Sequence, residues 1–323
     1  MNKTQKKIFS YTIKLLIVTL AGIFIYRKLL DNDNLKNFNE IILGLKKWQV
    51  WLTLIVIFLL MFVNWFLESI KWKFLISKVE KISLYKAIES VFCGLTWAIF
   101  TPNRVGEYGG RIFFLSPRKR IQGMVAMVVG SISQLIITNI LGSIATLWFL
   151  SKFIPMDNVL LFAISILVIG FCLFFLIFYF NIKWLFKLLN SIGFLKKFQK
   201  FFSVLTRYNK RELSKILLLS ISRFTVFTTQ YLLVIHLLIP DIHLYESAFM
   251  IFILFFVQSA LPSLDLLDIG VRSMTATYFF SFITHQEIAV MTATALIWLI
   301  NLIIPAILGS FFVFKLNFFD QRN

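Results

Sequence analysis

The chain has 323 residues, of which 59% are hydrophobic and only 15% are charged, and its formal net charge is +18. A soluble domain is usually about 45–50% apolar and about 25% charged, and a globule of this size could not bury the excess apolar surface. The composition therefore excludes a soluble enzyme, a disordered chain and a secreted disulfide scaffold, and it indicates a polytopic membrane protein. The positive charge lies in short loops between apolar runs, a pattern that serves topology and anionic headgroups rather than nucleic acid.

Long apolar runs predict the membrane spans, because about twenty apolar residues cross a bilayer as a helix. The first run follows Lys3, Lys6 and Lys7, as in a signal peptide, but no small-x-small cleavage site follows it, so we expect an anchor helix. The sequence predicts six full spans, at residues 8–26, 48–67, 121–150, 159–180, 216–239 and 288–314.

Two further apolar runs are too short to cross a bilayer. Residues 87–101 and 247–261 are followed by Pro102 and Pro262, and at about 1.5 Å per residue each run reaches only about 22 Å. That length suits one limb of a re-entrant hairpin. The predicted fold is therefore an all-α polytopic membrane protein with six full spans and two re-entrant helical hairpins, at residues 85–116 and 245–283.

The loop charges support this topology, since lysine and arginine accumulate on the cytoplasmic side. The net charge is +4 over residues 104–120 and +8 over residues 183–215, whereas residues 151–158 are neutral and residues 240–246 carry −2. Six spans and two hairpins place both termini and every strongly basic loop on the cytoplasmic side of the inner membrane. Only the loop at 27–47, with a net charge of +2, falls on the opposite side.

A basic segment joins the two halves of the predicted fold. It carries apolar residues at helical spacing, namely Phe194, Leu195, Phe198, Phe201, Phe202 and Leu205. The pattern predicts an interfacial amphipathic helix with Lys196, Lys197 and Lys200 toward the headgroups; an ordinary linker helix is the alternative. We expect one membrane domain, divided into an anchor and loop (1–47), a first repeat (48–150), a connection (151–215), a second repeat (216–314) and a tail (315–323).

An internal repeat relates the two halves. Ile-x-Leu-Tyr occurs at 82–85 and again at 242–245, and in both copies the tyrosine lies seventeen residues before the proline. An acid-x-Gly-x-Arg pattern then follows at 107–111 and at 268–272. Three spans separate the copies, and an odd number inverts the second, so we expect an inverted repeat of the kind that places transporter sites near the bilayer midplane.

The hairpin tips carry the candidate functional residues. The candidate substrate-binding residues are Arg104, Glu107 and Arg111 in the first copy and Asp265, Asp268 and Arg272 in the second; the candidate turn residues are Pro102, Gly106, Gly109, Pro262 and Gly270. An acid and an arginine four apart share one helix face, and intramembrane charges usually pair or line a pathway. One interpretation is that they are structural ion pairs, and the other is a site in which arginine binds a lipid phosphate through two hydrogen bonds. The two are compatible, because an ion pair can open when substrate arrives.

Other polar residues in the spans carry weaker signals. Arg223 lies one turn inside the span at 216–239, and Asn64 and Glu68 lie in the corresponding helix of the first copy; snorkelling explains Arg223 as well as function does. Cys93 and Cys172 are expected to be packing residues. The three histidines have no metal-ligand spacing, so no metal or cofactor is expected.

The doubled, proline-ended apolar run with acid-x-Gly-x-Arg resembles the flippase-like membrane protein family related to the transmembrane (flippase) region of the lysylphosphatidylglycerol synthases. The resemblance covers about residues 48–314 and implies two re-entrant hairpins and movement of a lipid between leaflets. Family members tend to have a glycine-rich turn after the proline, whereas this sequence keeps one glycine in the first copy (103–106) and none in the second (263–266). No soluble aminoacyl-transferase segment follows residue 323, so lipid synthesis by that route is not expected.

The expected function is translocation of an anionic lipid, a phospholipid or a polyprenyl-phosphate-linked lipid, between leaflets of the inner membrane. The expected partners are membrane lipids, not nucleic acid, and no enzyme activity is expected. A membrane-embedded enzyme acting on a lipid phosphate is one alternative, for which Asp265 and Asp268 are the closest approach to a catalytic pair. A non-catalytic membrane scaffold is the other.

Overall fold

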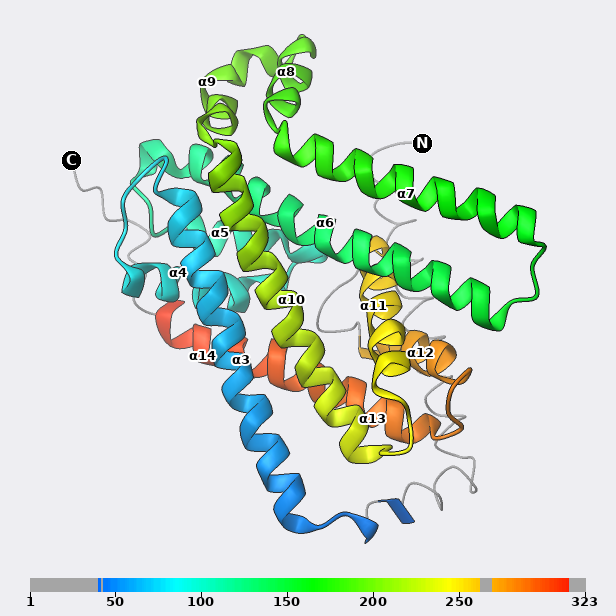
Figure 1. The fold of residues 1–323 in the computed structure, drawn as a ribbon. Helices are drawn as coiled ribbons and strands as arrows, with labels where there is room; N and C mark the ends of the chain where they lie inside the picture. Colours follow the sequence, from blue (N-terminus) through cyan, green and yellow to red (C-terminus); the bar gives the residue numbers. More distant parts are fainter. Residues whose placement is uncertain (1–39, 42, 262–268, 314–323) are drawn as a thin grey trace, which may run out of the picture.

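The structure is a computed structural model that describes residues 40–41, 43–261 and 269–313. The regular elements in these residues are helices (Figure 1). The long helices are α3 (Lys47–Ile76), α6 (Arg120–Phe153), α7 (Asn158–Phe180) and α10 (Lys210–Leu238). The shorter ones are α4 (Leu84–Ile99), α5 (Val105–Ile112), α8 (Lys183–Ser191), α9 (Gln199–Phe202), α11 (Leu244–Ala260), α12 (Ile269–Phe280), α13 (Glu287–Trp298) and α14 (Ile304–Val313), the last two joined by a π-helical turn at Leu299–Ile303.

Five of the predicted spans correspond to helices that are long and apolar enough to cross a membrane. They occupy Lys47–Ile76, Pro117–Phe153, Asn158–Phe180, Lys210–Leu238 and Glu287–Val313. The predicted span at 8–26 lies outside the described residues. The two shorter apolar runs also form helices, α4 and α11, which end at Ile99 and Ala260 as the prolines at 102 and 262 predict.

The boundary predicted for the second span is wrong, because α3 continues nine residues past Leu67. Glu68 and Lys71 lie in this extension and are both buried. Each has an ion-pair partner inside the protein, so the charges that suggested a loop are accommodated within the helix.

The first hairpin turns sharply between α4 and α5. Asn103 and Arg104 have φ values of 51° and 57°, in the left-handed region that side-chain-bearing residues rarely occupy. Oγ1 of Thr101 accepts a hydrogen bond from the backbone N–H of Gly106 (2.7 Å) and so holds the start of α5. The predicted break at Pro102–Gly106 is confirmed, and it reverses the chain so that α5 packs back on α4.

Glycine permits the close contact between the two hairpin helices. A Cβ atom on Gly110 would lie 2.6 Å from the Cα atom of Gly94, and one on Gly106 would lie 2.3 Å from the carbonyl oxygen of Trp97. Gly109, which the sequence suggested as a turn residue, lies instead inside α5, where a Cβ atom would have ordinary room beside Trp97. The structure therefore assigns the tight contact to Gly110 in place of Gly109.

The second half of the chain has the same order of elements as the first. A long helix (α10) is followed by a short apolar helix (α11), a second short helix (α12) that packs on it, and a long helical segment (α13–α14). Gly270 is buried near the start of α12. Pro262 lies outside the described residues, as does the rest of 262–268.

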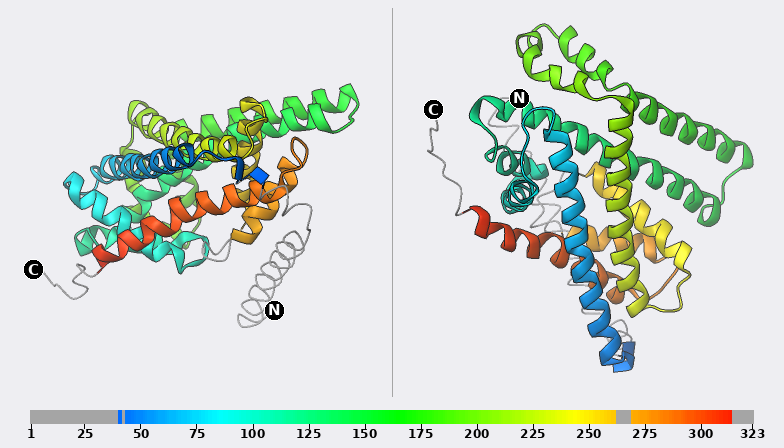
Figure 2. Two further views of the ribbon diagram at one scale, coloured as in Figure 1. Left: turned by 90° about the horizontal axis from the view of Figure 1, so that it is seen from below. Right: turned by 60° about the vertical axis from the view of Figure 1, so that its left-hand side comes forward.

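The two long helices that begin these halves lie side by side and antiparallel, as Figures 1 and 2 show. Near one end of the pair, Gln230 of α10 donates a hydrogen bond to the carbonyl oxygen of Ile57 in α3 (2.8 Å). Near the other end, Tyr208, just before α10, donates to the carbonyl oxygen of Leu75 (2.9 Å). The two contacts occur in opposite order along α3 and α10, so the two helices are antiparallel.

Each hairpin packs against the last helix of the other half. Helix α4 packs on α14, and α11 packs on α6. A glycine lies at both crossings: a Cβ atom on Gly309 would be 2.0 Å from the carbonyl oxygen of Phe92, and one on Gly142 would be 2.3 Å from Cβ of Phe256. The two crossings therefore use equivalent helices, and each has a glycine that leaves no room for a Cβ atom; the nearest atom is a backbone oxygen at Gly309 and a side-chain carbon at Gly142.

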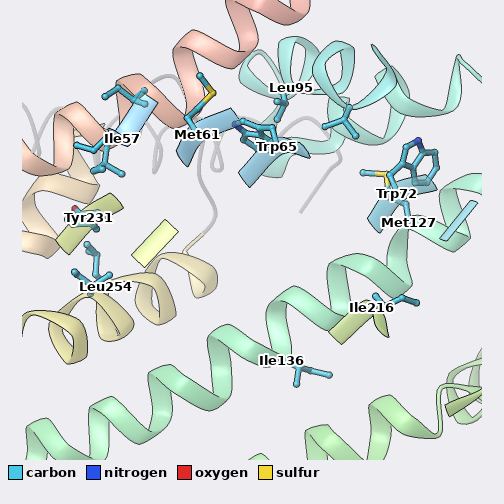
Figure 3. Packing of buried hydrophobic residues seen from close by; sticks show 14 of the residues in the cluster. Ile57, Met61, Trp65, Trp72, Leu95, Met127, Ile136, Ile216, Tyr231 and Leu254 are labelled. Carbon is cyan, nitrogen blue, oxygen red and sulfur yellow. The ribbon is translucent and has the colours of Figure 1, made fainter. Parts of the chain in front are cut away.

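One hydrophobic core joins these helices (Figure 3). Ile57, Met61 and Trp65 of α3 face it together with Tyr231 of α10 and Leu254 of α11. Helix α7 lies along α6 in Figure 1, and no residue of its most apolar window is buried. Its outer surface is therefore apolar and available to lipid.

The predicted amphipathic helix in the basic connection is wrong as a single helix. Residues 195–207 form short turns, Leu195–Phe198, α9 and Ser203–Arg207, instead of one continuous helix. Tertiary contacts explain the interruption: Val204 and Leu205 are buried, and the phenol of Tyr208 docks on α3. The same burial raises the pKa of Tyr208 above its ordinary value.

Candidate functional site: a charged cluster in a polar cavity

A polar face on the apolar helix α3 begins the site. Asn64, Glu68 and Lys71 are spaced four and three residues apart, so they point in one direction. The first hairpin brings Glu107 and Arg111 on α5 to this face, and the antiparallel packing of α10 brings Arg223. The left-handed turn before α5 adds Arg104.

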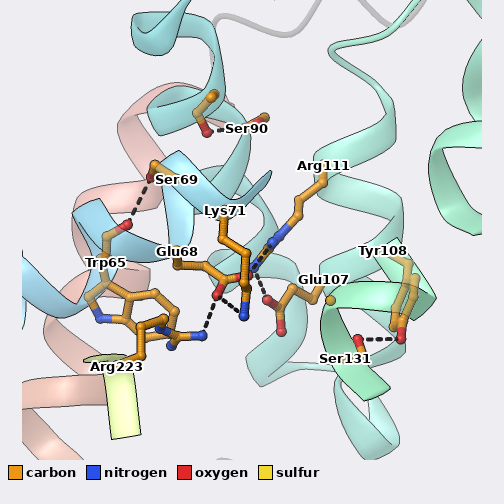
Figure 4. A network of polar contacts seen from close by, with 12 residues as sticks. Trp65, Glu68, Ser69, Lys71, Ser90, Glu107, Tyr108, Arg111, Ser131 and Arg223 are labelled. Carbon is orange, nitrogen blue, oxygen red and sulfur yellow. Dashed lines mark hydrogen bonds and ion pairs between the residues drawn. The ribbon is translucent and has the colours of Figure 1, made fainter. Parts of the chain in front are cut away.

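Glu68 is the centre of this cluster (Figure 4). Its Oε1 accepts a hydrogen bond from Nη1 of Arg111 (2.7 Å), and its Oε2 lies 2.8 Å from Nζ of Lys71. Nη1 of Arg223 also donates to Oε2 of Glu68, while Nε of Arg223 donates to Oδ1 of Asn64 (3.0 Å). One carboxylate thus ties together α3, the first hairpin and α10.

Glu107 is the second carboxylate of the cluster. It accepts a hydrogen bond from Nη2 of Arg111 within α5, and its Oε2 lies 3.1 Å from Nε of Arg104. The predicted pairing of Glu107 with Arg111 on one helix face is therefore confirmed. Arg111 is held by two carboxylates at once, which fixes the plane of its guanidinium group.

The cluster carries more positive than negative charge. Glu68 and Glu107 supply two negative charges, whereas the cationic side chains supply four positive ones, a net charge of +2. The cationic members are Lys71, Arg104, Arg111 and Arg223. The side chains of Lys71 and Arg111 are only 3% and 2% exposed, but that of Arg104 is 37% exposed. Positive charge therefore extends from the buried centre to an accessible rim.

The charged residues of the cluster line two adjoining chambers. The hairpin-1 chamber, about 390 Å³ in volume, is lined by Glu68, Glu107 and Arg111 among others. The hairpin-2 chamber, about 280 Å³ in volume, is lined by Arg272. The two chambers adjoin and share wall residues, namely Trp65, Arg104, Gln134, Thr138, Arg223 and Ser259.

The structure brings together some of the sequence-predicted residues and separates others. Arg104, Glu107 and Arg111 lie in one cluster. Arg272 lies in the other chamber, where its Nη1 donates a hydrogen bond to Oε1 of Gln258 (3.1 Å). The predicted residues Asp265 and Asp268 lie outside the described residues. Arg111 and Arg272, one from each half of the chain, therefore line adjoining chambers.

Sequence reasoning missed the contribution of α3. Lys71 was not a candidate, and Asn64, Glu68 and Arg223 were noted only as polar residues in spans. The spacing of the three polar residues on α3 is the signal that could have found them, since an apolar span rarely carries a charged face without a partner. Arg223 is paired inside the protein, with its guanidinium over the Trp65 ring (5.2 Å), so pairing explains it better than snorkelling.

Comparison with known proteins gives the family. A search of curated proteins returned no match. A family model described as the lysylphosphatidylglycerol synthase TM region matches residues 11–309, nearly the whole chain. This match agrees with the apolar helices of the fold, which make the protein a multi-pass membrane protein. The chain belongs to the family of the lysylphosphatidylglycerol synthase TM region.

Proposed function

We propose that this protein translocates an anionic lipid, a phospholipid or a polyprenyl-phosphate-linked lipid, between the leaflets of the inner membrane. The observation that carries the proposal is a pair of adjoining chambers with charged walls inside an apolar helical bundle, one lined by Arg111 of the first hairpin and the other by Arg272 of α12. Buried arginines in a membrane protein are costly unless they pair or serve a pathway. A net charge of +2 in the cluster favours an anion in the cavity.

The architecture supports this function through an inverted repeat with two re-entrant hairpins. The antiparallel packing of α3 and α10 and the equivalent crossings of α4 on α14 and α11 on α6 are what such a repeat predicts. Inverted repeats place substrate sites at the interface of the two halves, near the bilayer midplane. The cavity is lined by residues of both halves.

The proposed mechanism exchanges ion-pair partners. Without lipid, Glu68 and Glu107 hold Arg111. An entering phosphate first meets the accessible Arg104, then competes with the carboxylates for Arg111, because a guanidinium group binds phosphate and carboxylate in the same two-pronged way. Arg104 and Arg223 lie on the wall that the chambers share, so the phosphate can pass toward Arg272 with positive charge beside it throughout. The acyl chains stay in the bilayer.

We propose transport in preference to catalysis because of how the two carboxylates are held. Glu68 pairs with Lys71, Arg111 and Arg223, and Glu107 pairs with two arginines. A general base needs a carboxylate that is free to take a proton from the substrate. Carboxylates that are committed to several cations serve better to keep those cations in place.

Lipid movement in reconstituted vesicles tests the proposal. We expect the purified protein to move a fluorescent phosphatidylglycerol between leaflets, and Arg104→Gln and Arg272→Gln each to slow this movement by about tenfold or more, since a charge-assisted hydrogen bond to phosphate contributes about 1.5–3 kcal/mol. Arg118→Gln is the matched control, because Arg118 is exposed in the loop before α6 and lines neither chamber. Movement by the wild-type protein at the rate of protein-free vesicles would refute the function.

The proposed topology has its own test. We place the loop with Arg118 on the cytoplasmic side and the loop with Asp157 on the other, following the excess of basic residues in the first. In cells, a membrane-impermeant maleimide added from outside should label Asp157→Cys and not Arg118→Cys, with the wild-type protein as the blank. Both loop residues are exposed, so the label can reach them. The reverse pattern would invert the orientation.

A further inference from the structure

The hairpin-2 chamber has hydrogen-bond acceptors that a phosphate cannot use. Within the described part of the chain, Oε1 of Gln134 and Oδ1 of Asn301 are buried atoms without a hydrogen-bond partner, and both residues line this chamber. Asn301 is only 5% exposed. An unpaired buried polar atom costs about 1–3 kcal/mol, so these two acceptors need donors from whatever occupies the chamber.

The chain holds Asn301 in this position through a local irregularity. The helix from α13 to α14 contains the π-helical turn Leu299–Ile303, and Pro305 follows two residues later. Proline has no N–H, so it cannot donate the α-helical hydrogen bond to the carbonyl of Asn301, four residues earlier. Single π-turns are frequent at functional sites because they redirect a side chain. Here the turn presents an amide to the cavity from the second half of the chain.

The residues that line the chamber favour one class of hydrogen-bond donor in a bound lipid. A phosphate diester offers acceptors only, and two acceptors facing each other repel. An ammonium group would also supply donors, but it would place a further positive charge beside the three arginines that line this chamber. Those arginines are Arg104, Arg223 and Arg272. Uncharged hydroxyl groups supply donors without adding positive charge, so they fit the chamber best.

Resting on the function proposed above, we infer that Asn301 and Gln134 form a second subsite for the uncharged, hydroxyl-bearing part of the lipid headgroup. The arginines hold the phosphate, and the two amide oxygens accept hydrogen bonds from hydroxyl groups attached to it. The residues come from different halves of the chain, Gln134 from α6 and Asn301 from the π-turn. Arg104, Arg223 and both amides line the same chamber, so one headgroup can reach both types of group.

Binding of matched lipids to the purified full-length protein tests the subsite. Dioctanoyl-phosphatidylglycerol and dioctanoyl-phosphatidylpropanol carry the same single negative charge and the same three-carbon headgroup, and they differ only in the two hydroxyl groups. Trp65 and Trp298 line the chamber, so their fluorescence reports binding. We expect phosphatidylglycerol to bind about tenfold more tightly, the effect of one or two hydrogen bonds. Asn301→Leu should abolish this difference by weakening phosphatidylglycerol alone, and Gln134→Met, on another helix, should reduce it.

The controls separate this subsite from the function it rests on. Asn139→Leu makes the same chemical change at a buried asparagine of α6 that lines neither chamber, and it should keep the tenfold preference. Equal binding of the two lipids to the wild-type protein, with both weakened by Arg104→Gln, would overturn the subsite and leave the phosphate site intact. Binding of phosphatidylethanolamine more tightly than phosphatidylglycerol would also overturn it, in favour of an amine. No response of either anionic lipid to Arg104→Gln, together with absent lipid movement, would remove the proposed function.

Discussion

Replacing Glu68 by glutamine is expected to abolish most lipid movement and to lower the free energy of unfolding by about 3–5 kcal/mol, the usual cost of leaving buried charges without their partner. The substitution keeps the shape of the side chain and removes one negative charge. Lys71 and Arg223 then lose their carboxylate, and Arg111 keeps only Glu107. Thermal unfolding of the purified protein and lipid movement in vesicles are the two measurements.

A double variant that restores the charge balance of the cluster tests the reason for this loss of stability. Glu68→Gln combined with Lys71→Met removes one negative and one positive charge from the same place, so we expect part of the stability to return. Glu80→Gln is the control, because the Glu80 carboxylate accepts a hydrogen bond from an exposed backbone N–H of Ser116 (3.1 Å) and lines neither chamber. Glu68→Gln with wild-type stability would show that the cluster does not hold the three helices together.

Gly309→Ala is expected to destabilise the fold, whereas Gly170→Ala is expected to leave it unchanged or stabilise it. Alanine is favoured over glycine in a helix by about 1 kcal/mol. At Gly170 a Cβ atom meets nothing within 4 Å, so the helix preference decides. At Gly309 the new methyl group would lie 2.0 Å from the carbonyl oxygen of Phe92, a backbone atom that cannot move away without separating α14 from α4. Overpacking of this kind costs about 1–3 kcal/mol or more.

The equivalent crossing supplies a second measurement of the same effect. Gly142→Ala, where α6 crosses α11, should destabilise in the same direction, since its Cβ atom would lie 2.3 Å from Cβ of Phe256. The fraction of each variant that remains monodisperse after heating in detergent measures the order of stability. A Gly309→Ala protein as heat-resistant as Gly170→Ala would show that the crossing of α4 on α14 can open without cost.

Much of the fold could be predicted from local sequence patterns. Apolar length predicted five long helices, and Pro102 predicted the break after α4, because both effects depend on residues that are neighbours in the chain. The pairing of Glu107 with Arg111 followed from a spacing of four on one helix. These parts require no knowledge of which helices meet.

The remaining part of the site depends on contacts between distant segments. Glu68 and Arg223 are 155 residues apart, and their pairing requires the antiparallel packing of α3 on α10. The same contact explains why α3 runs past Leu67: a charge that ends an isolated apolar span can stay inside a helix when a tertiary partner receives it. In the basic connection, burial of Leu205 and docking of Tyr208 prevailed over an amphipathic pattern.

The exchange of outer helices between the two halves has a mechanical consequence. Because α4 packs on α14 and α11 packs on α6, each at a glycine that leaves no room for a Cβ atom, neither α4 nor α11 can move away from the centre without moving the closing helix of the opposite half. In the proposed transporter, a movement at either hairpin would therefore be transmitted to the other half of the chain. Loosening one glycine crossing would weaken this coupling on that side alone.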